Sequence, residues 1–572
     1  MTSAYKVRAL EFHDSSHIWN IECLRKTLKF MVDNDLNTLV LHQVDIIDEI
    51  VYPGRVFGIS QTSNIHETYE KMYRTLYRYA PRRRGVPNMR KGFLRLLVQE
   101  ALRFGIKVYL ENKEIWFPDM LLEFYPHLIK RGTVCPSEEF WWEEFLPAKY
   151  EELFQDFPEL AGVVISTATG ESRVSISRRR CECEKCKKMD PVEWHHKVIT
   201  SIYEALKKAK KQLVIRDFVF NKEAHQVFTK VISHLPEDIV VSIKNTPHDY
   251  YPTFPHNPLI GKTGGRPQWL EFDAMAQYFG WGIGISVMLE DLRDRMLHGL
   301  EKGATGFLVR TDLESLPNHS CFRTPNLINL YGAAQLGKDP LADFANIYHR
   351  WLSETRMFED GSSPEDRKKC VKWLKELFSY TWPIIRKTLF VDDCVFSDSS
   401  MFPVSVEHAL WLAEEKNSLK EWNPQKEDAL APTLQNLEKV FKEKEEAELL
   451  LDKVQKLLAL EGKSPLRKES YQELIKRFDF FHKYAKGFWL IAKAFMICRV
   501  CEAGISLDSS IPKYGKLNEL VQKIKGELEE YEGELRGLEL SLKDYPVNLL
   551  LDADRFACFR KDFEKRIAKL VN

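Results

Sequence analysis

The feature that most constrains the fold is a unit that recurs along the first part of the chain. In each unit a short apolar run, rich in β-branched residues, ends in charged or amide residues and leads into a helix-like segment. The unit is clearest in three consecutive runs, at residues 213–218, 240–244 and 269–273. Strands of a parallel sheet read as continuous apolar runs because helices cover both faces of the sheet. Where such a sheet closes into a barrel, the C-terminal ends of its strands carry the chemistry.

These units predict an α/β fold, namely a (β/α)8 TIM barrel over residues 1–360. Amphipathic helices are expected between the strands, as at 21–33, 91–103 and 191–211, whereas the basic stretch 82–87 is expected to form a loop. The predicted strands are residues 5–12, 37–44, 105–112, 161–166, 213–218, 240–244, 269–273 and 303–312.

The pattern changes at about residue 363, after which no strand pattern recurs. Apolar residues such as Leu434, Leu437 and Phe441 repeat at helical spacing, and prolines punctuate the segments. We therefore expect an all-α C-terminal domain over residues 361–572. Its many apolar faces leave homodimerisation open.

Composition narrows the class of protein. Lys+Arg and Asp+Glu both total 83 in 572 residues, and nucleic-acid binders usually carry a basic excess, so no nucleic-acid partner is expected. No secretory signal pattern is visible, and the apolar segment 487–500 is shorter than the roughly 20 residues of a membrane span. The 11 cysteines are odd in number and scattered, as is typical of reduced thiols. We expect a soluble cytoplasmic protein that does not bind membranes.

Two carboxylates follow predicted strands. Glycoside hydrolysis needs one carboxyl to protonate the leaving oxygen and usually a second to activate water or attack. Glu171 follows the fourth strand on a Gly-Glu turn, and Asp249 follows the sixth in a polar loop; turn or capping roles are the alternatives. Arg216 and Lys244 end apolar strands, where a cation either pairs with a carboxylate or binds an anionic substrate group, and both options are open.

A cluster of three cysteines has partial metal-ligand character. Cys181, Cys183 and Cys186 have spacings that suit metal ligation, and His195 or His196 could supply a fourth ligand. Structural zinc sites usually show two Cys-x-x-Cys pairs, and only one is visible. We therefore expect reduced loop thiols and neither a metal nor a cofactor, with zinc as the alternative.

Several motifs resemble one known family, the family 67 α-glucuronidases. Those enzymes share an Ile-Lys-Asn-Gly-Pro-x-Asp motif, a Ser-Pro-Leu-Phe-Gly turn and a Leu-Glu-Phe strand, in the order of residues 243–249, 255–261 and 270–272 here. Residues 104–110 and 216–219 resemble their third and fifth strands. The resemblance covers about residues 5–355, and a helical C-terminal domain is also a family feature, whereas the family's N-terminal α/β domain has no counterpart.

The resemblance implies roles for individual residues. Glu171 would be the general acid, and Asp249 one of two carboxylates that hold the attacking water in an inverting reaction. Arg216 and Lys244 would contact substrate in the uronate site. The remaining residues expected to bind substrate are His13, Asn245, Glu271 and Gln277.

Two departures from the family affect this interpretation. Gln277 stands where the family has its second water-binding carboxylate, and Thr167 stands where it has a lysine four residues ahead of the acid. The resemblance implies an exo-acting glycosidase that removes a terminal uronic acid or related sugar from short oligosaccharides, as in xylan degradation. The alternatives are a carbohydrate-binding or regulatory pseudo-glycosidase, which Gln277 favours, and a lyase or isomerase that uses Lys244.

Overall fold

The computed structural model describes residues 3–13, 15–57, 81–167, 169–176, 181–217, 221–313, 316, 319–416, 419–460, 466–540 and 544–571. The chain forms two compact units. The barrel unit comprises Met1–Asn245, Asn257–Phe272 and Met296–Asn318; the helical unit comprises Thr246–His256, Asp273–Arg295 and His319–Asn572. The boundary predicted at residue 360 stays a prediction about where independently folding domains divide.

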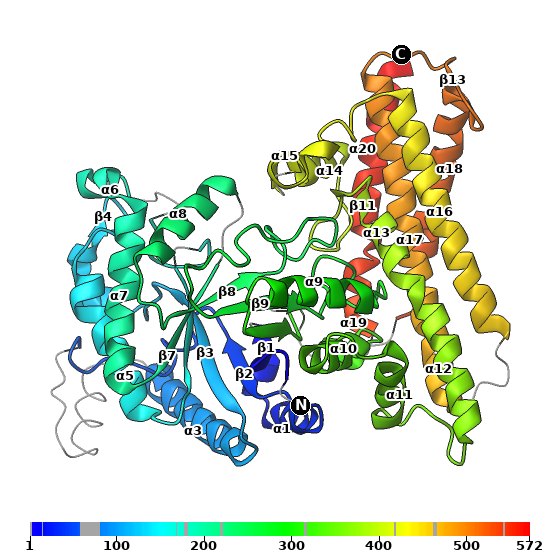
Figure 1. Ribbon diagram of the computed structural model, residues 1–572. Helices are drawn as coiled ribbons and strands as arrows, with labels where there is room; N and C mark the ends of the chain where they lie inside the picture. The colour runs from blue at the N-terminus through cyan, green and yellow to red at the C-terminus, as the bar shows by residue number, and fades with distance from the viewer. Residues whose placement is uncertain are drawn as a thin grey trace. The chain divides into compact units, whose positions relative to one another are not determined.

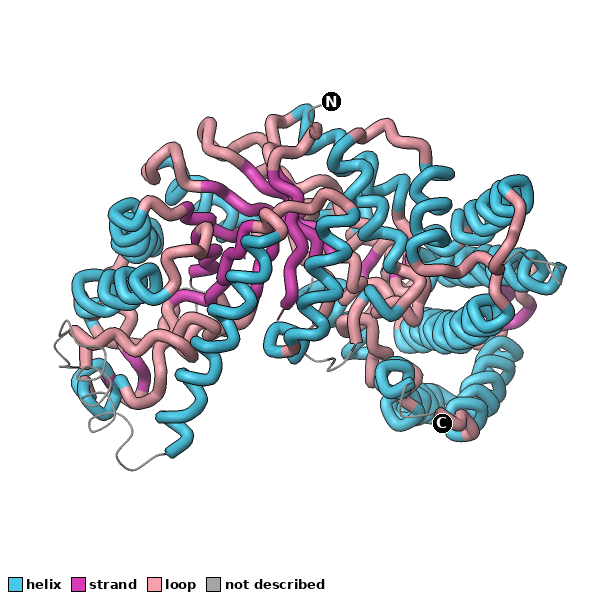
Figure 2. Tube along the Cα trace, turned by 90° about the horizontal axis from the view of Figure 1, so that it is seen from below, coloured by secondary structure: helices cyan, strands magenta, loops and turns pink. Residues whose placement is uncertain are grey.

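Eight parallel strands close into a barrel in the order in which they occur along the chain, which confirms the predicted (β/α)8 fold (Figure 1, Figure 2). Each overlaps a predicted strand, with its ends shifted by a few residues; Phe218, at the end of the fifth predicted strand, lies outside the described residues. The barrel strands are β1 (Val7–His13), β2 (Thr38–His42), β3 (Lys107–Glu114), β6 (Gly162–Thr167), β7 (Gln212–Arg216), β8 (Val240–Lys244), β9 (Gln268–Asp273) and β10 (Gly306–Arg310).

Helices of the barrel unit connect these strands. They include α1 (Ile21–Asp33), α3 (Pro81–Arg103), α4 (Leu121–Phe124), α5 (Leu146–Asp156), α6 (Glu184–Lys188), α7 (Pro191–Ala209) and α8 (Lys222–Ser233), and α9 (Leu289–Glu301) runs from the helical unit into the barrel unit. The N-terminus of α7 is fixed by its sequence: Asp190 caps it by accepting from the Val192 amide, and Pro191 occupies the first turn.

The loop predicted at residues 82–87 is wrong, because α3 begins at Pro81 and continues through that stretch. Proline is favoured at the first helical position, and arginine is a good helix former, so the basic run supports a helix. Pro87 lies inside the helix and was the residue that suggested a turn. Pro87 therefore does not end helix α3, although proline usually ends or kinks a helix.

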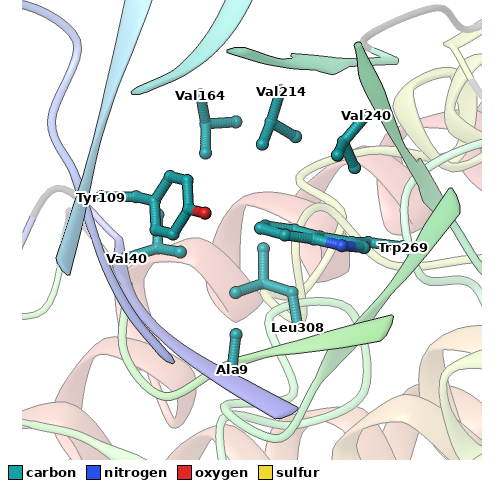
Figure 3. Close-up of a cluster of buried hydrophobic side chains, with 8 residues drawn as sticks. All are labelled: Ala9, Val40, Tyr109, Val164, Val214, Val240, Trp269 and Leu308. Atoms are coloured by element: carbon teal, nitrogen blue, oxygen red, sulfur yellow. The ribbon is translucent and has the colours of Figure 1, made fainter. Parts of the chain in front are cut away.

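One apolar side chain from each barrel strand points inward, and together these side chains form a packed layer (Figure 3). This layer consists of Ala9, Val40, Tyr109, Val164, Val214, Val240, Trp269 and Leu308. The Tyr109 and Trp269 rings meet edge to face, with centroids 5.6 Å apart. Two glycines make room for them, since a Cβ on Gly162 would lie 2.9 Å from the Tyr109 ring and a Cβ on Gly306 2.6 Å from the Trp269 ring. The barrel is thus closed at this level by packed side chains.

The C-terminal part of the chain is largely helical, as predicted, and the helical unit is built around its longest helix, α17. Helix α17 packs against α16, α18 and α20 (Figure 1). The other helices of this unit are shorter. The bounds are α10 (Leu327–Lys338), α11 (Phe344–Glu354), α12 (Pro364–Ser379), α13 (Thr381–Thr388), α14 (Val406–Trp411), α15 (Leu419–Trp422), α16 (Leu434–Leu460), α17 (Lys468–Glu502), α18 (Leu517–Arg536), α19 (Tyr545–Leu550) and α20 (Ala553–Val571).

The expectation that no strand follows residue 363 needs a small correction. Two hairpins with two-residue strands occur, β11 (Phe390–Val391) with β12 (Cys394–Val395) and β13 (Ser510–Ile511) with β14 (Gly515–Lys516). Strands this short carry no period-two pattern and so leave no signal in the sequence. Among the described residues, no helix is both long and apolar enough to cross a bilayer.

Candidate active site

A ring of polar side chains lies directly above the apolar layer of the barrel. Side chains two positions apart on a strand point to the same face, so each apolar-layer residue predicts an inward-facing residue two positions later. In every strand that residue is polar. The polar layer consists of Glu11, His42, Glu111, Ser166, Arg216, Ser242, Glu271 and Arg310, all of them buried.

Arg216 is the central cation of the polar layer. Its Nε lies 2.9 and 2.8 Å from the two carboxylate oxygens of Glu271, and its Nη1 lies 2.9 Å from Glu111 Oε1. All three side chains are 0% exposed. Of the two roles left open by the sequence, the structure shows the carboxylate-paired one, and any effect of Arg216 on substrate has to act beside Glu111 and Glu271.

A second group in this layer is centred on Glu11. Its Oε1 accepts hydrogen bonds from Nδ1 of His13 and Nδ1 of His42, both at 2.7 Å. Nε2 of His13 lies 3.2 Å from Nη2 of Arg310, which can only donate. This arrangement assigns His13 the neutral tautomer with its proton on Nδ1. His13 therefore belongs to a buried network with Glu11, His42 and Arg310, and its predicted contact with substrate stays a prediction.

The carboxyl groups of the polar layer differ in the direction of their pKa shifts. Burial raises the pKa of Glu111, and although Arg216 opposes this, the pKa reaches about 7. Burial also acts on Glu11 and Glu271, but there the Arg216 charge and hydrogen bonds outweigh it and hold both pKa values below the ordinary range. Burial lowers the pKa of His42 well below its usual value, so this imidazole is neutral. Carboxyl groups of different proton affinity thus share one site.

Glu171 stands above this layer on a tight turn after β6. The Glu171 amide donates to Thr169 Oγ1 at 3.2 Å, the Thr169 amide donates to Ser172 Oγ at 3.1 Å, and Ser172 Oγ donates to the Glu114 carbonyl at 2.8 Å. The turn is therefore fastened to the end of β3. The Glu171 carboxylate is 39% exposed, so it can meet a substrate from solvent.

Lys113 is a functional candidate that the sequence reasoning missed. It projects from β3 two positions beyond Glu111, is buried, and places its Nζ 3.4 Å from Glu171 Oε2. The resemblance suggested that Thr167 removes a cation beside the acid; Lys113 supplies one from a different strand. The alternation on β3 after Tyr109 was the only sequence signal that could have found it.

Lys244 and Asn245 close β8 as predicted. Lys244 is buried; burial and the Arg216 charge contribute most to the lowered pKa of Lys113, and the Lys244 charge adds to it. The side-chain amide of Asn245 donates to the Glu271 carbonyl at 2.7 Å, and its backbone amide donates to the same oxygen at 3.1 Å. Asn245 therefore joins the ends of β8 and β9, and its contact with substrate stays a prediction.

Asp249 and Gln277 belong to the helical unit. Asp249 has a left-handed backbone (φ 46°), its carboxylate is 14% exposed, and Oδ2 lies 3.7 Å from Nε2 of His248. The Gln277 amide donates to Asp273 Oδ2 at 2.8 Å, and its carbonyl accepts from Ser400 Oγ at 2.8 Å. The pairing of Asp249 with Glu171 as base and acid stays a prediction.

Among the residues that the structure describes, two groups have the side-chain chemistry of a metal site. Glu11, His13 and His42 are one; both Nδ1 atoms are engaged in hydrogen bonds to Glu11 Oε1, whereas Glu11 Oε2 and His42 Nε2 are buried without a hydrogen-bond partner in the described part of the chain. The other is the cluster of Cys181, Cys183 and Cys186. A fourth cysteine, Cys135, joins this cluster from an earlier part of the sequence.

Comparison with solved structures finds chains similar to this one. A GH138 enzyme targeting pectin rhamnogalacturonan II matches with a TM-score of 0.63 and 12% identity, over 100% of this chain and 85% of that chain. A β-N-acetylhexosaminidase from Bacteroides fragilis matches with a TM-score of 0.41 and 12% identity, over 62% of this chain and 71% of that chain. A GH20 exo-β-N-acetylglucosaminidase from Vibrio harveyi matches with a TM-score of 0.40 and 12% identity, over 62% of this chain and 58% of that chain. No protein-family model and no curated protein matches the sequence. The chain shares the fold of the GH138 enzyme.

Proposed function

We propose that the protein is a glycoside hydrolase that removes an acidic sugar from the end of a carbohydrate chain, in the manner of an α-glucuronidase. The observation that supports this most is the position of Glu171. Its side chain is 39% exposed and stands on a braced turn at the C-terminal end of a barrel strand, above the polar layer. Active sites of barrel enzymes lie at this end of the strands, so the position suits a general acid that meets its substrate from solvent.

The preference for an acidic sugar rests on the cations around this position. Lys113 and Lys244 follow the polar layer on their strands, and Arg310 lies within that layer. Burial and the charges of Arg216 and Lys244 lower the pKa of Lys113, whereas Glu171 and Glu111 act to raise it. A substrate carboxylate would add a further anion beside these cations, which a neutral sugar would not. Uronides are therefore the first substrates to examine.

Asp249 completes the proposal as the base that activates water, with inversion at the anomeric carbon. An inverting pair needs its carboxyl groups roughly 6.5–9.5 Å apart so that water fits between substrate and base. An amide cannot take a proton from water at neutral pH, so Gln277 would supply only a hydrogen bond. Asp249 would then act without the second carboxylate of the α-glucuronidases.

The test compares Glu171→Gln with the wild type on aryl uronides that carry poor or activated leaving groups. Loss of general-acid catalysis should lower kcat by roughly 10²–10⁴-fold for poor leaving groups and much less for activated ones. Glu193→Gln, on the exposed surface of α7, is the matched control and should leave both rates unchanged. Equal losses on both substrate types would contradict the role of Glu171.

Two further measurements separate the finer parts of the proposal. The substrate panel should include glucuronides, galacturonides, their neutral counterparts and pectin fragments, since the GH138 neighbour is described as targeting pectin rhamnogalacturonan II. Proton NMR of the first-formed anomer should show inverted configuration, and retention would contradict the role of Asp249. Uronide binding by calorimetry without turnover of any panel member would favour the pseudo-glycosidase alternative.

A further inference from the structure

Four cysteine sulfurs of the barrel unit converge at one point. Cys135 directly follows a small hairpin of β4 (Ile129–Lys130) and β5 (Thr133–Val134), whereas Cys181, Cys183 and Cys186 lie in the loop after β6 and in α6. All four Sγ atoms lie within 4.8 Å of one another. Cys135 Sγ is 3.6 Å from Cys183 Sγ and 3.5 Å from Cys186 Sγ. The sequence shows only three of these residues together, which is why the cluster reads there as incomplete.

The separations fit tetrahedral metal coordination and do not fit disulfides. A zinc ion with Zn–S bonds of about 2.3 Å holds its four sulfurs roughly 3.8 Å apart. A disulfide would bring two sulfurs to about 2.05 Å, far closer than the 3.5 and 3.6 Å found between Cys135 and its neighbours. A tetrahedral set of four sulfurs is characteristic of zinc or iron, and the geometry points to a structural zinc ion bound by Cys135, Cys181, Cys183 and Cys186.

The surroundings provide the hydrogen bonds that metal-bound thiolates usually accept. Ser137 Oγ lies 3.1 Å from Cys135 Sγ and 3.3 Å from Cys186 Sγ, so its one hydroxyl proton can be donated to either of the two thiolates. The Cys186 amide donates to Cys183 Sγ at 3.4 Å, in the first turn of α6. Such donors orient the ligands and offset the charge of four thiolates. They are already in place around the cluster.

The backbone at Cys135 is held from outside the cluster by two buried tryptophans. Trp141 Nε1 donates to the Cys135 carbonyl and Trp194 Nε1 donates to the Pro136 carbonyl, both at 2.8 Å. A cavity of about 360 Å³, lined among others by Pro136, Cys181 and Cys186, gives an ion a path to the site. A framed ligand set with an entry path is what a metal site requires.

The zinc ion would join two excursions from the barrel. One is the segment after β3 that contains the β4–β5 hairpin, and the other is the loop after β6, on which Glu171 precedes the cysteines. None of the four cysteines is among the residues proposed to act on the substrate, so the metal would act on structure and not on the chemical step.

Metal analysis of the full chain tests the inference. Protein purified without chelators after growth with added zinc should contain about one zinc per chain. The Cys183→Ser/Cys186→Ser variant should contain none, and Cys23→Ser, which replaces a half-buried cysteine of α1 outside the cluster, should keep the full amount. Equal zinc in the cluster variant and the wild type would overturn the proposal, and so would iron in place of zinc.

A second measurement uses only the wild-type protein and so does not depend on the variant folding. Stepwise addition of an organomercurial, which binds thiolates, should release one zinc per chain to a coloured indicator in proportion to the blocking of four thiols. Replacement of zinc by cobalt should give the intense visible absorption of a tetrahedral thiolate complex. Four freely reactive thiols with no metal released, or cysteines found as disulfides, would overturn the assignment.

Discussion

Lys113 and Glu171 form a pair in which one partner is buried and the other meets solvent. The 3.4 Å between Lys113 Nζ and Glu171 Oε2 defines an ion pair beside the proposed general acid. A substrate carboxylate that binds here would meet the same cation, so Lys113 should contribute to a preference for acidic sugars. Removing the cation should weaken that preference.

The corresponding experiment is Lys113→Met. The value of kcat/KM for uronides should fall more than that for neutral glycosides, because only the uronides lose an ionic contact. Lys107→Met, at the exposed start of the same strand, is the control and should leave both values unchanged. Equal losses on both substrate classes in Lys113→Met would mean that Lys113 does not bind a substrate carboxylate.

Individual residues also show where sequence reasoning succeeds and where it cannot. Glu171, Arg216 and Lys244 could be found because each follows an apolar run along the chain. Cys135 and Lys113 could not, because their importance depends on neighbours that are distant in sequence: Cys186 for the first and Glu171 for the second. Whether Arg216 pairs with a carboxylate or a ligand likewise depends on which strand carries its partner.

At the scale of single elements, helix α17 shows how tightly the helical unit is packed. Gly487 lies mid-helix, where glycine is about 1 kcal/mol less favourable than alanine. A Cβ there would lie 2.6 Å from Phe402 Cζ and 2.7 Å from the Tyr531 hydroxyl. The close approach of these rings thus explains a residue that helix propensity disfavours.

The prediction is that Gly487→Ala destabilises the protein by about 1–3 kcal/mol despite its better propensity, because the methyl group overpacks the site. Gly526→Ala in α18, where nothing lies within 4 Å of the added carbon, should instead stabilise by up to about 1 kcal/mol. Urea unfolding followed by circular dichroism measures both. A stabilising Gly487→Ala would show that Phe402 and Tyr531 move aside at little cost.

For the whole molecule, buried ionisable groups make stability depend on pH. Burial raises the pKa of Glu111 to about 7 and that of Asp48 to about 7, so in the folded state each keeps a proton that the unfolded chain releases near pH 4 to 5. Their contribution is full below the unfolded pKa and is lost as pH rises towards 7. Burial lowers the pKa values of His42 and His195, so the unfolded chain binds protons at these groups more readily than the folded protein does. These two groups therefore reduce stability as the pH falls below about 6.5. Variants must therefore be compared with the wild type at each pH.

Glu111→Gln should gain unfolding free energy relative to the wild type between pH 5 and 7, by an amount of the order of 3 kcal/mol, since one pKa unit corresponds to about 1.4 kcal/mol. Urea titrations at pH 5, 6 and 7 give the difference. Glu139→Gln, at an exposed position, should run parallel to the wild type. A difference between Glu111→Gln and the wild type that is constant with pH would mean that Glu111 has the same proton affinity folded and unfolded.

The apolar and polar layers of the barrel also limit which mutations such a protein can accept during evolution. Val214 and Arg216 face inward because they are two positions apart, and Ile215 between them faces the helices. Insertion or deletion of one residue within β7 would turn the Arg216 cation outwards. It would also place an apolar side chain in the polar layer. Point substitutions can therefore alter the charges of this layer one at a time. Changes in length are confined to the connections between strands, so new substrate preferences should arise in the loops while the strand lengths stay fixed.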